Sequence, residues 1–504
     1  MKLLKSLTTV SGYTIGSRVA GFLRETITAS LLGSGAAADA LIVAIKLPSL
    51  LRRLLAEGAF NAAFVPMFAG MIAKDGKDSA KNFAEEVFSV LVVFLMVFVV
   101  VMEFAMPWLT PIFVPGFKET PERLEMAITF SRLTFPFILF ISLTALYSGI
   151  LNSFEKFAAA AASPMMGNIF IIAFVMTLST YITNSGVLIA AAITGCGIVQ
   201  LLWVLVPAIR SGTVLRILPP RNTPNLKRFL FRMGPAALGS GVHQVNIVIG
   251  TAIASLLPVG GISYLHYAER LNQFPLSVIG TALSVVLLPF LAKSIRKGRH
   301  QDAQSIQTQG IELAMLLTIP SAVALFILAE PLIKMLYQHG AFDAQSARYT
   351  SYALMAYSLG LPAYVLTKIF NTTFYALEDT VTPLITAIVA VMVDVVFSLI
   401  LLKPFQHVGI AFATAISAWV NVALLGYLLN RKDFFSINNH LKKYSLGLGL
   451  SCISTGLVLW MAKSYLTVYV FQGGIVRILA VSTLVILGLL RWLFIEKKSF
   501  LFRR

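Results

Sequence analysis

The sequence predicts an all-α polytopic membrane protein with 14 transmembrane helices. They would form two pseudo-symmetric six-helix lobes, related as a parallel repeat, plus two C-terminal helices around a central cavity. Three observations predict this fold: the composition, a series of long apolar windows and an internal repeat. Of the 504 residues, 57% are hydrophobic and 12% are charged, and the mean hydropathy is +0.82. This composition is typical of membrane proteins and excludes a soluble core.

Apolar windows of the length that an α-helix needs to cross the hydrocarbon, about 20 residues, recur along the chain. No stretch between them is long enough for a soluble domain. The predicted helices cover residues 7–32, 36–70, 84–108, 126–151, 158–182, 185–209, 228–256, 261–293, 309–330, 347–377, 381–402, 407–430, 444–463 and 474–495.

The net charge of +18 is distributed over short loops. It is not gathered on a folded domain, which argues against nucleic-acid binding. If the chain begins in the cytoplasm, the cytoplasmic loops carry most of the Lys and Arg residues, from Lys2 and Lys5 to Arg503 and Arg504. The positive-inside rule therefore predicts that both termini are cytoplasmic. The N-terminus lacks an uninterrupted apolar region and a cleavage site, so we treat it as part of the mature protein.

An internal repeat organises the predicted helices. The stretch "IGSRVAGFLRETITASLLGSG" from Ile15 resembles "LGSGVHQVNIVIGTAIASLLPVGG" from Leu238, and Pro48 falls near Pro275 in the same register. Because the repeat unit has six helices, an even number, both copies enter the membrane from the same side. The two copies are therefore related by an axis along the membrane normal. We expect an N-lobe over 1–222, a C-lobe over 223–434 and a helix pair over 435–504, with a cleft between the lobes.

Charged residues concentrate in the first, second and eighth predicted helices. On the first helix Ser17 and Arg24 share one face, and Arg18 and Glu25 share another. The second helix carries a stripe that can largely neutralise itself, with Arg52 about 100° away from it. A kink at Pro48 can change the angular position of the residues that follow it, including Arg52, relative to those that precede it. The stripe consists of Asp39, Lys46, Arg53 and Glu57.

Four arginines lie where a central cavity is expected. Nearby acids can pair with them, but this pairing does not explain why the arginines lie on the helices that face the cavity. Guanidinium groups bind phosphate or pyrophosphate bidentately, so the cluster predicts an anion site. The alternative is simple pairing, as between Arg53 and Glu57, or snorkelling of long side chains to the interface. The arginines are Arg18, Arg24, Arg52 and Arg270, and the acids are Glu25, Asp39, Glu57 and Glu269.

Motifs for nucleotide binding and for hydrolytic catalysis are absent, which favours a transporter over an enzyme. Cys196 and Cys452 have no Cys or His nearby at ligand spacing, so neither a disulfide framework nor a zinc site is expected. No cofactor is predicted, and an ion gradient, the membrane potential or the substrate's own gradient would supply the energy. Asp394, a lone acid on an apolar helix, is either a sodium or proton site or a buried structural acid.

Several stretches resemble the MurJ (MviN) family of lipid II flippases, within the multidrug/oligosaccharidyl-lipid/polysaccharide exporter superfamily. The resemblance covers the first twelve helices and is most specific in the first 70 residues and around the eighth helix. The stretches are "SRVAGFLRE" from Ser17, "ADALIVAIKLPSLLRRLLAEGAFNAAFVPMFA" from Ala38, "VPGF" from Val114, "TFPFILFISLTALYSGILNSF" from Thr134, "MGPAALG" from Met233 and "YAERLNQFPLSVIGTALSVVLLPFLAK" from Tyr267.

The resemblance implies alternating access in a bacterial cytoplasmic membrane. Lipid II, a polyprenyl-pyrophosphate-linked disaccharide-pentapeptide, would be the substrate of a protein functional as a monomer among membrane lipids. Glu25 stands where the family has Asp. Asp394 and Thr414 would contribute to a sodium site described for some members, although the seventh helix here offers His243 and Asn246 in place of an acid. The C-terminal pair would line a groove for the lipid tail. Family cavity positions are Ser17, Arg18, Arg24, Asp39, Arg52, Glu57, Ser263, Glu269 and Arg270.

Other readings remain open from the sequence. An ion-coupled multidrug exporter would present an acidic, aromatic pocket, whereas this cavity is rich in arginine. A flippase for another lipid-linked saccharide would share the same fold. A polymerase or ligase would need a large outer loop with acids or histidines, and the longest outer loops, 107–125 and 331–347, offer little.

Overall fold

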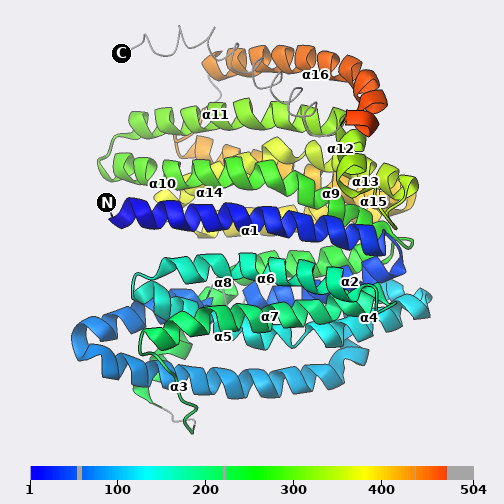
Figure 1. Cartoon of the computed structure of the whole chain (residues 1–504). Helices are drawn as coiled ribbons and strands as arrows, with labels where there is room; N and C mark the ends of the chain where they lie inside the picture. The colour runs from blue at the N-terminus through cyan, green and yellow to red at the C-terminus, as the bar shows by residue number, and fades with distance from the viewer. Residues whose placement is uncertain (1, 54–58, 220–222, 437–438, 474–504) are drawn as a thin grey trace. The chain divides into compact units, whose positions relative to one another are not determined.

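The computed structural model describes residues 2–53, 59–219, 223–436 and 439–473. These residues are almost entirely helical, and no strand occurs among them (Figure 1). The helices fall into two compact units, Met1–Ser263 with His339–Asp343, and Tyr264–Gln338 with Ala344–Arg504. The all-α fold class is confirmed, while the predicted lobe boundary at 222/223 stays a prediction.

The first unit contains eight helices and a short 3-10 helix within its described residues, and it also holds the start of α9. They are α1 (Lys2–Leu32), α2 (Ala36–Arg52), α3 (Ala59–Phe113), η2 (Pro115–Glu119), α4 (Pro121–Thr134), α5 (Phe137–Ser153), α6 (Phe157–Leu178), α7 (Ser185–Arg210) and α8 (Pro224–Ser255).

The second unit contains the remaining described helices. They are α9 (Gly261–Pro275), the π-helical turn η3 (Leu276–Gly280), α10 (Thr281–Arg296), α11 (His300–Ile327), α12 (Ala329–Tyr337), α13 (Ala344–Ser358), α14 (Leu361–Ala376), α15 (Val381–Arg431) and α16 (Asn439–Gly473).

Thirteen of the fourteen predicted windows lie on these helices, and the last, 474–495, lies outside the described residues. α15 holds two of these windows, and α3 holds one window and the end of the window 36–70. α3 has 55 residues and α15 has 51, and at about 1.5 Å per residue each is far longer than the roughly 30 Å of hydrocarbon. Each is broken by a residue outside helical geometry, Gly76 (φ 84°) in α3 and Gln406 (φ 49°) in α15.

Eight of the described helices are long and apolar enough to cross a membrane, or up to nine if the bent pair α13 and α14 forms one span. Two of the eight are the broken helices, whose lengths allow two crossings each. The first predicted helix, α1, is less apolar because it carries Arg18, Arg24 and Glu25. A helix with this composition fits the lining of a polar cavity better than a surface in contact with lipid.

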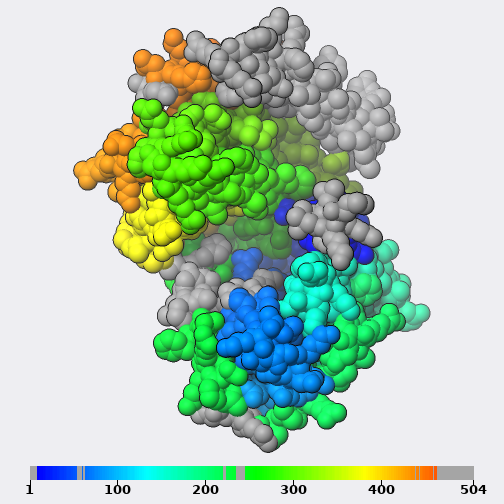
Figure 2. Space-filling model, turned by 90° about the vertical axis from the view of Figure 1, so that its left-hand side faces the viewer, coloured from blue at the N-terminus to red at the C-terminus, as the bar shows by residue number. Residues whose placement is uncertain are grey.

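A cluster of phenylalanines packs the two arms of α3 together and joins them to α8. The ring of Phe64 stacks on those of Phe68 and Phe83, with centroids 5.3 and 5.7 Å apart. Phe229 of α8 meets Phe60 edge to face at 5.5 Å. The bend of α3 between its arms, in bright blue, lies on the face shown in Figure 2. Burial of these aromatic rings holds α8 in the first unit.

The loop His339–Asp343 docks on the end of α1. The Ala341 N–H donates to the carbonyl of Ser30 at 2.7 Å. Gly340 has a positive φ of 59°, and a Cβ there would lie 2.3 Å from the same carbonyl oxygen. Only glycine fits both the backbone conformation and the space.

Replacing Gly340 by Ala should therefore lower the free energy of unfolding by about 2–3 kcal/mol, through backbone strain and the clash with Ser30. Gly298→Ala is the matched control, because Gly298 also has a positive φ (67°) but nothing within 4 Å of its Cβ position. That variant should lose about 1 kcal/mol. Thermal unfolding of the purified protein measures both, and equal losses would contradict the role given to Ser30.

Candidate functional site

Arg24 of α1 lies between a carboxylate and an amide. Its Nη2 donates to Glu25 Oε1 at 2.7 Å, and its Nη1 donates to Asn168 Oδ1 on α6 at 3.1 Å. Asn168 Nδ2 in turn donates to the Ser17 carbonyl at 3.3 Å. The Glu25 side chain is 11% exposed and that of Arg24 is 30% exposed, so part of this guanidinium is accessible. The structure thus brings Ser17, Arg24 and Glu25 together.

Arg52 approaches the same region from α2. The charges of Arg24 and Arg52 both act on the thiol of Cys196 in α7. Arg52 is half-buried, whereas the neighbouring Arg53 is exposed. Of the two adjacent arginines, Arg52 is therefore the one that joins Arg24 inside the first unit.

Three of the other predicted cavity residues are exposed in the structure, and a fourth lies outside the described residues. Arg18 is exposed on α1, and Glu57 lies outside the described residues. In the second unit Glu269 and Arg270 are exposed on α9, and Glu269 accepts a hydrogen bond from Gln273 Nε2 at 2.8 Å. The buried phenols Tyr357 and Tyr364 lie near enough to Glu269 for its charge to act on them.

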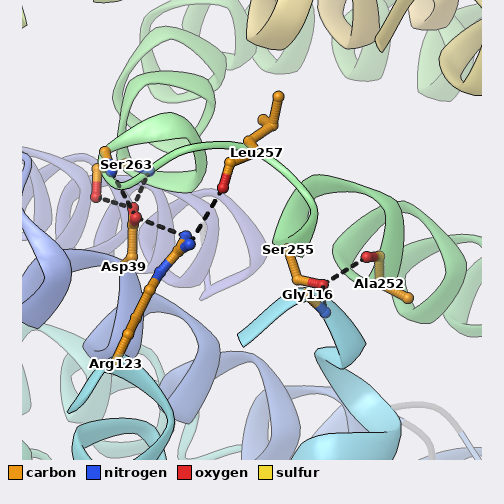
Figure 3. Close-up of polar contacts among 8 residues, drawn as sticks. Asp39, Gly116, Arg123, Ala252, Ser255, Leu257 and Ser263 are labelled. Atoms are coloured by element: carbon orange, nitrogen blue, oxygen red, sulfur yellow. Dashed lines mark hydrogen bonds and ion pairs between the residues drawn. The ribbon is translucent and has the colours of Figure 1, made fainter. Parts of the chain in front are cut away.

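Asp39 lies in a separate, fully buried cluster at the start of α2 (Figure 3). Its Oδ2 accepts from Arg123 Nη2 and from the Gly260 N–H, both at 2.7 Å. Its Oδ1 accepts from the Ser263 N–H at 2.8 Å and from the Ser263 hydroxyl at 2.5 Å. We call Asp39, Arg123, Gly260 and Ser263 the latch. It brings two predicted site residues, Asp39 and Ser263, into direct contact.

The predicted self-neutralising stripe on the second helix is wrong for Asp39, whose ion-pair partner comes from another helix. Asp39 pairs with Arg123 of α4, and Lys46 Nζ donates to the Thr251 hydroxyl of α8 at 3.2 Å. Helical spacing placed these charges on one stripe but could not show that neighbouring helices supply their partners. The charge of Asp39 is balanced by the helix packed against α2.

Asp394 and Thr414, the predicted sodium ligands, lie together on the two arms of α15. The Thr414 hydroxyl donates to the Ile410 carbonyl at 3.0 Å, and its oxygen is within hydrogen-bonding reach of Asp394. Among the described residues, buried Asp394 Oδ1 has no hydrogen-bond donor. Carboxylate and hydroxyl oxygens suit a hard cation such as Na⁺. No group of three or more His, Cys, Asp or Glu side chains in the described part could hold a metal ion.

Comparison with known proteins identifies the family. The family model described as lipid II flippase MurJ matches residues 28–480. The chain belongs to the MurJ family. It is 42% identical to the probable lipid II flippase MurJ of Rhizobium tropici, over 86% of this chain and 82% of that protein. It is 32% identical to the lipid II flippase MurJ of Burkholderia cenocepacia, over 92% and 91%.

Solved structures support the same fold. A structure described as lipid II flippase MurJ in an inward closed conformation matches with a TM-score of 0.79 and 26% identity, covering 98% of this chain and 99% of that one. An inward-facing multidrug transporter of the MOP superfamily matches with a TM-score of 0.67 and 16% identity, over 83% and 94%. The second match shows the fold alone. The predicted family is confirmed.

Sequence reasoning missed two residues of these networks. Arg123 stands just before the predicted helix 126–151, and Asn168 stands inside an apolar helix without any motif. Asn168 did carry a signal, because an amide at membrane depth needs a hydrogen-bonding partner. Nothing local to Arg123 pointed to Asp39, which lies 84 residues away along the chain.

Replacing Asn168 by Leu should lower the free energy of unfolding by about 1 kcal/mol or more, because Arg24 loses a hydrogen-bond acceptor. Asn168→Asp keeps an acceptor of similar size at that position and should cost less. Thermal unfolding of the two purified variants distinguishes them. Unchanged stability in Asn168→Leu would show that the bond to Arg24 contributes nothing.

Proposed function

We propose that this chain is a lipid II flippase that moves the undecaprenyl-pyrophosphate-linked peptidoglycan precursor from the cytoplasmic to the periplasmic leaflet by alternating access. Membership of the MurJ family supports the substrate class. The observation that carries the proposal is the placement of Arg24 and Arg52 on α1 and α2, which both contact α7 inside the first unit. Two guanidinium groups beside apolar helices need an anionic partner or a function.

A pyrophosphate suits this pair chemically. Arginine presents a planar fork that binds phosphate oxygens bidentately. In the structure Glu25 occupies one edge of the Arg24 fork, at 2.7 Å. An arriving pyrophosphate would compete with this carboxylate, and Glu25 would take the guanidinium back when the headgroup leaves. The Arg24 guanidinium would therefore have an anionic partner in both states.

A polar cavity removes the main barrier to translocation. A headgroup of sugars, amino acids and phosphates would otherwise lose its water in hydrocarbon without replacement partners. We propose that the full predicted set lines the path at successive stages. These residues are Ser17, Arg18, Arg24, Glu25, Asp39, Arg52, Glu57, Ser263, Glu269 and Arg270.

The chain is a multi-pass membrane protein of a flippase family, and we infer that it acts without chemical catalysis. We place it in the bacterial cytoplasmic membrane, as a monomer, with both termini in the cytoplasm. α1 would then run outward from the cytoplasm, and the latch, which includes the start of α2, would lie on the periplasmic side. On this assignment a closed latch accompanies a path that is shut towards the periplasm.

We propose that Asp394 and Thr414 hold a coupling cation, Na⁺ or H⁺, in the second unit. The buried Asp394 Oδ1 without a hydrogen-bond donor supports this assignment. The membrane potential is a further energy source, because each charge moved across it is worth about 2.3 kcal/mol per 100 mV. A cationic empty cavity would be drawn towards the negative cytoplasmic side.

Adjacent arginines provide a matched test of the anion site. Arg52→Ala should reduce the appearance of lipid II in the outer leaflet at least tenfold, whereas Arg53→Ala should leave it within twofold of the parent. The measurement is the access of an external lipid II-modifying reagent in cells depleted of the native protein and supplied with each variant. Equal activity of the two variants would remove Arg52 from the site, and outer-leaflet lipid II persisting under depletion alone would reject the flippase assignment.

Asp394→Asn tests the coupling site. If Asp394 holds the coupling cation, transport in vesicles should depend on Na⁺ or on pH in the parent, and this dependence should vanish in the variant. Asp379→Asn is the control, because Asp379 is also an acid of the second unit but pairs with Lys432 at 2.7 Å in a loop. An unchanged ion dependence in Asp394→Asn would exclude the site.

A further inference from the structure

The latch joins the facing ends of two consecutive helices. α8 ends at Ser255 and α9 begins at Gly261, so a short turn separates them. The last carbonyls of a helix and its first N–H groups have no partner within the helix and carry partial negative and positive charges. Asp39 and Arg123 supply the complementary charge at each of these two ends.

Asp39 caps the start of α9 from another helix. It accepts the N–H groups of Gly260 and Ser263, which lie at and just inside the first turn. A carboxylate at a helix N-terminus is stabilised by these donors and by the helix dipole. The Ser263 hydroxyl adds a further hydrogen bond to the same carboxylate.

Arg123 binds the opposite end of the turn. Its Nη1 donates to the Leu257 carbonyl at 3.2 Å, just beyond the end of α8, while its Nη2 holds Asp39. The guanidinium carbon lies 3.9 Å from the centre of the Phe117 ring. Gly116, beside that ring, approaches α8 so closely that a Cβ would lie 2.3 Å from the Ser255 carbonyl. η2 and α4 thus seat the guanidinium against the turn.

We propose that Arg123 is a positioning residue of the periplasmic gate, which aims Asp39 at the start of α9 and ties the α8–α9 turn to α4. Its side chain is 3% exposed and that of Asp39 is 0% exposed, so neither charge is satisfied by solvent. The planar guanidinium with its two Nη groups is needed at this position because it bonds the Asp39 carboxylate and the Leu257 carbonyl simultaneously. Loss of either bond loosens both helix ends.

This inference rests on the proposed function in one respect, namely that the latch faces the periplasm and separates when the path opens outward. Leu257, Gly260 and Ser263 belong to the second predicted repeat, whereas Asp39 and Arg123 belong to the first. Outward opening would move these segments apart and break every bond of the latch. The strength of the Arg123 contacts would then set how often the gate opens.

The test measures opening directly. Val43 lies one turn beyond Asp39 on α2 and is 1% exposed, so a cysteine there reports whether the latch end has opened. In a full-length chain with Cys196 and Cys452 replaced by Ala, Val43→Cys is labelled from the periplasmic side with a membrane-impermeant thiol reagent. We expect Arg123→Gln to raise the labelling rate at least fivefold. Arg123→Lys, which keeps the charge but not the fork, should raise it less.

Arg132→Gln is the matched control, because Arg132 is an exposed arginine of the same helix and its Nε donates to the Glu103 carbonyl at 3.2 Å, away from the latch residues. It should leave the labelling rate unchanged. Should Arg123→Gln not accumulate in the membrane, Arg123→Lys alone decides the outcome. Labelling rates equal to the parent's in every Arg123 variant that accumulates would overturn the proposal.

A structural role without gating is distinguished by a second readout. Thermal unfolding of Asp39→Asn, Arg123→Gln and the double variant gives the coupling between the two residues. Coupling with unchanged labelling would mean that the pair supports the fold but does not position a gate, which also overturns the proposal. Faster labelling without lipid II transport would leave this inference standing and reject the substrate assignment instead.

Discussion

One buried carboxylate organises the end of the first unit. Asp39, on α2, accepts hydrogen bonds from α4 and from the segment that runs from the turn after α8 into α9, both of which are far from it in the sequence. A buried charge that loses its partner typically costs about 3–5 kcal/mol, so the three segments must stay together while Asp39 remains ionised and buried. The position of α8 relative to the N-terminal helices depends on this contact, together with the phenylalanine cluster of α3 and α8.

The network around Arg24 has a different character. It consists of one carboxylate, one amide and a guanidinium that is 30% exposed. Ion pairs with partial access to water exchange partners easily because each partner can be replaced by solvent. This arrangement suits a ligand that must bind and then leave.

The sequence predicted the helices well because hydropathy and helix length are local properties. Thirteen windows match described helices, and even the breaks at Gly76 and Gln406 fall between predicted windows. The partners of the charges could not be predicted in the same way. Periodicity assigned Asp39 to a stripe on its own helix, yet its partner Arg123 is 84 residues away and reaches it only through the packing of α4 on α2. The choice of Arg52 over Arg53 needed the family resemblance, and burial now supports it.

The contrast between the two networks explains how one unit can both bind a headgroup and change conformation. Four hydrogen bonds, from Arg123, Gly260 and Ser263, converge on the two oxygens of Asp39. Because the bonds share one buried carboxylate, loss of one bond also weakens the others. Such a cluster tends to be wholly formed or wholly broken. The Arg24 network, with an accessible cation, can instead change by degrees as one anion replaces another. A binding site that adjusts gradually and a latch that switches abruptly are the two elements that alternating access requires.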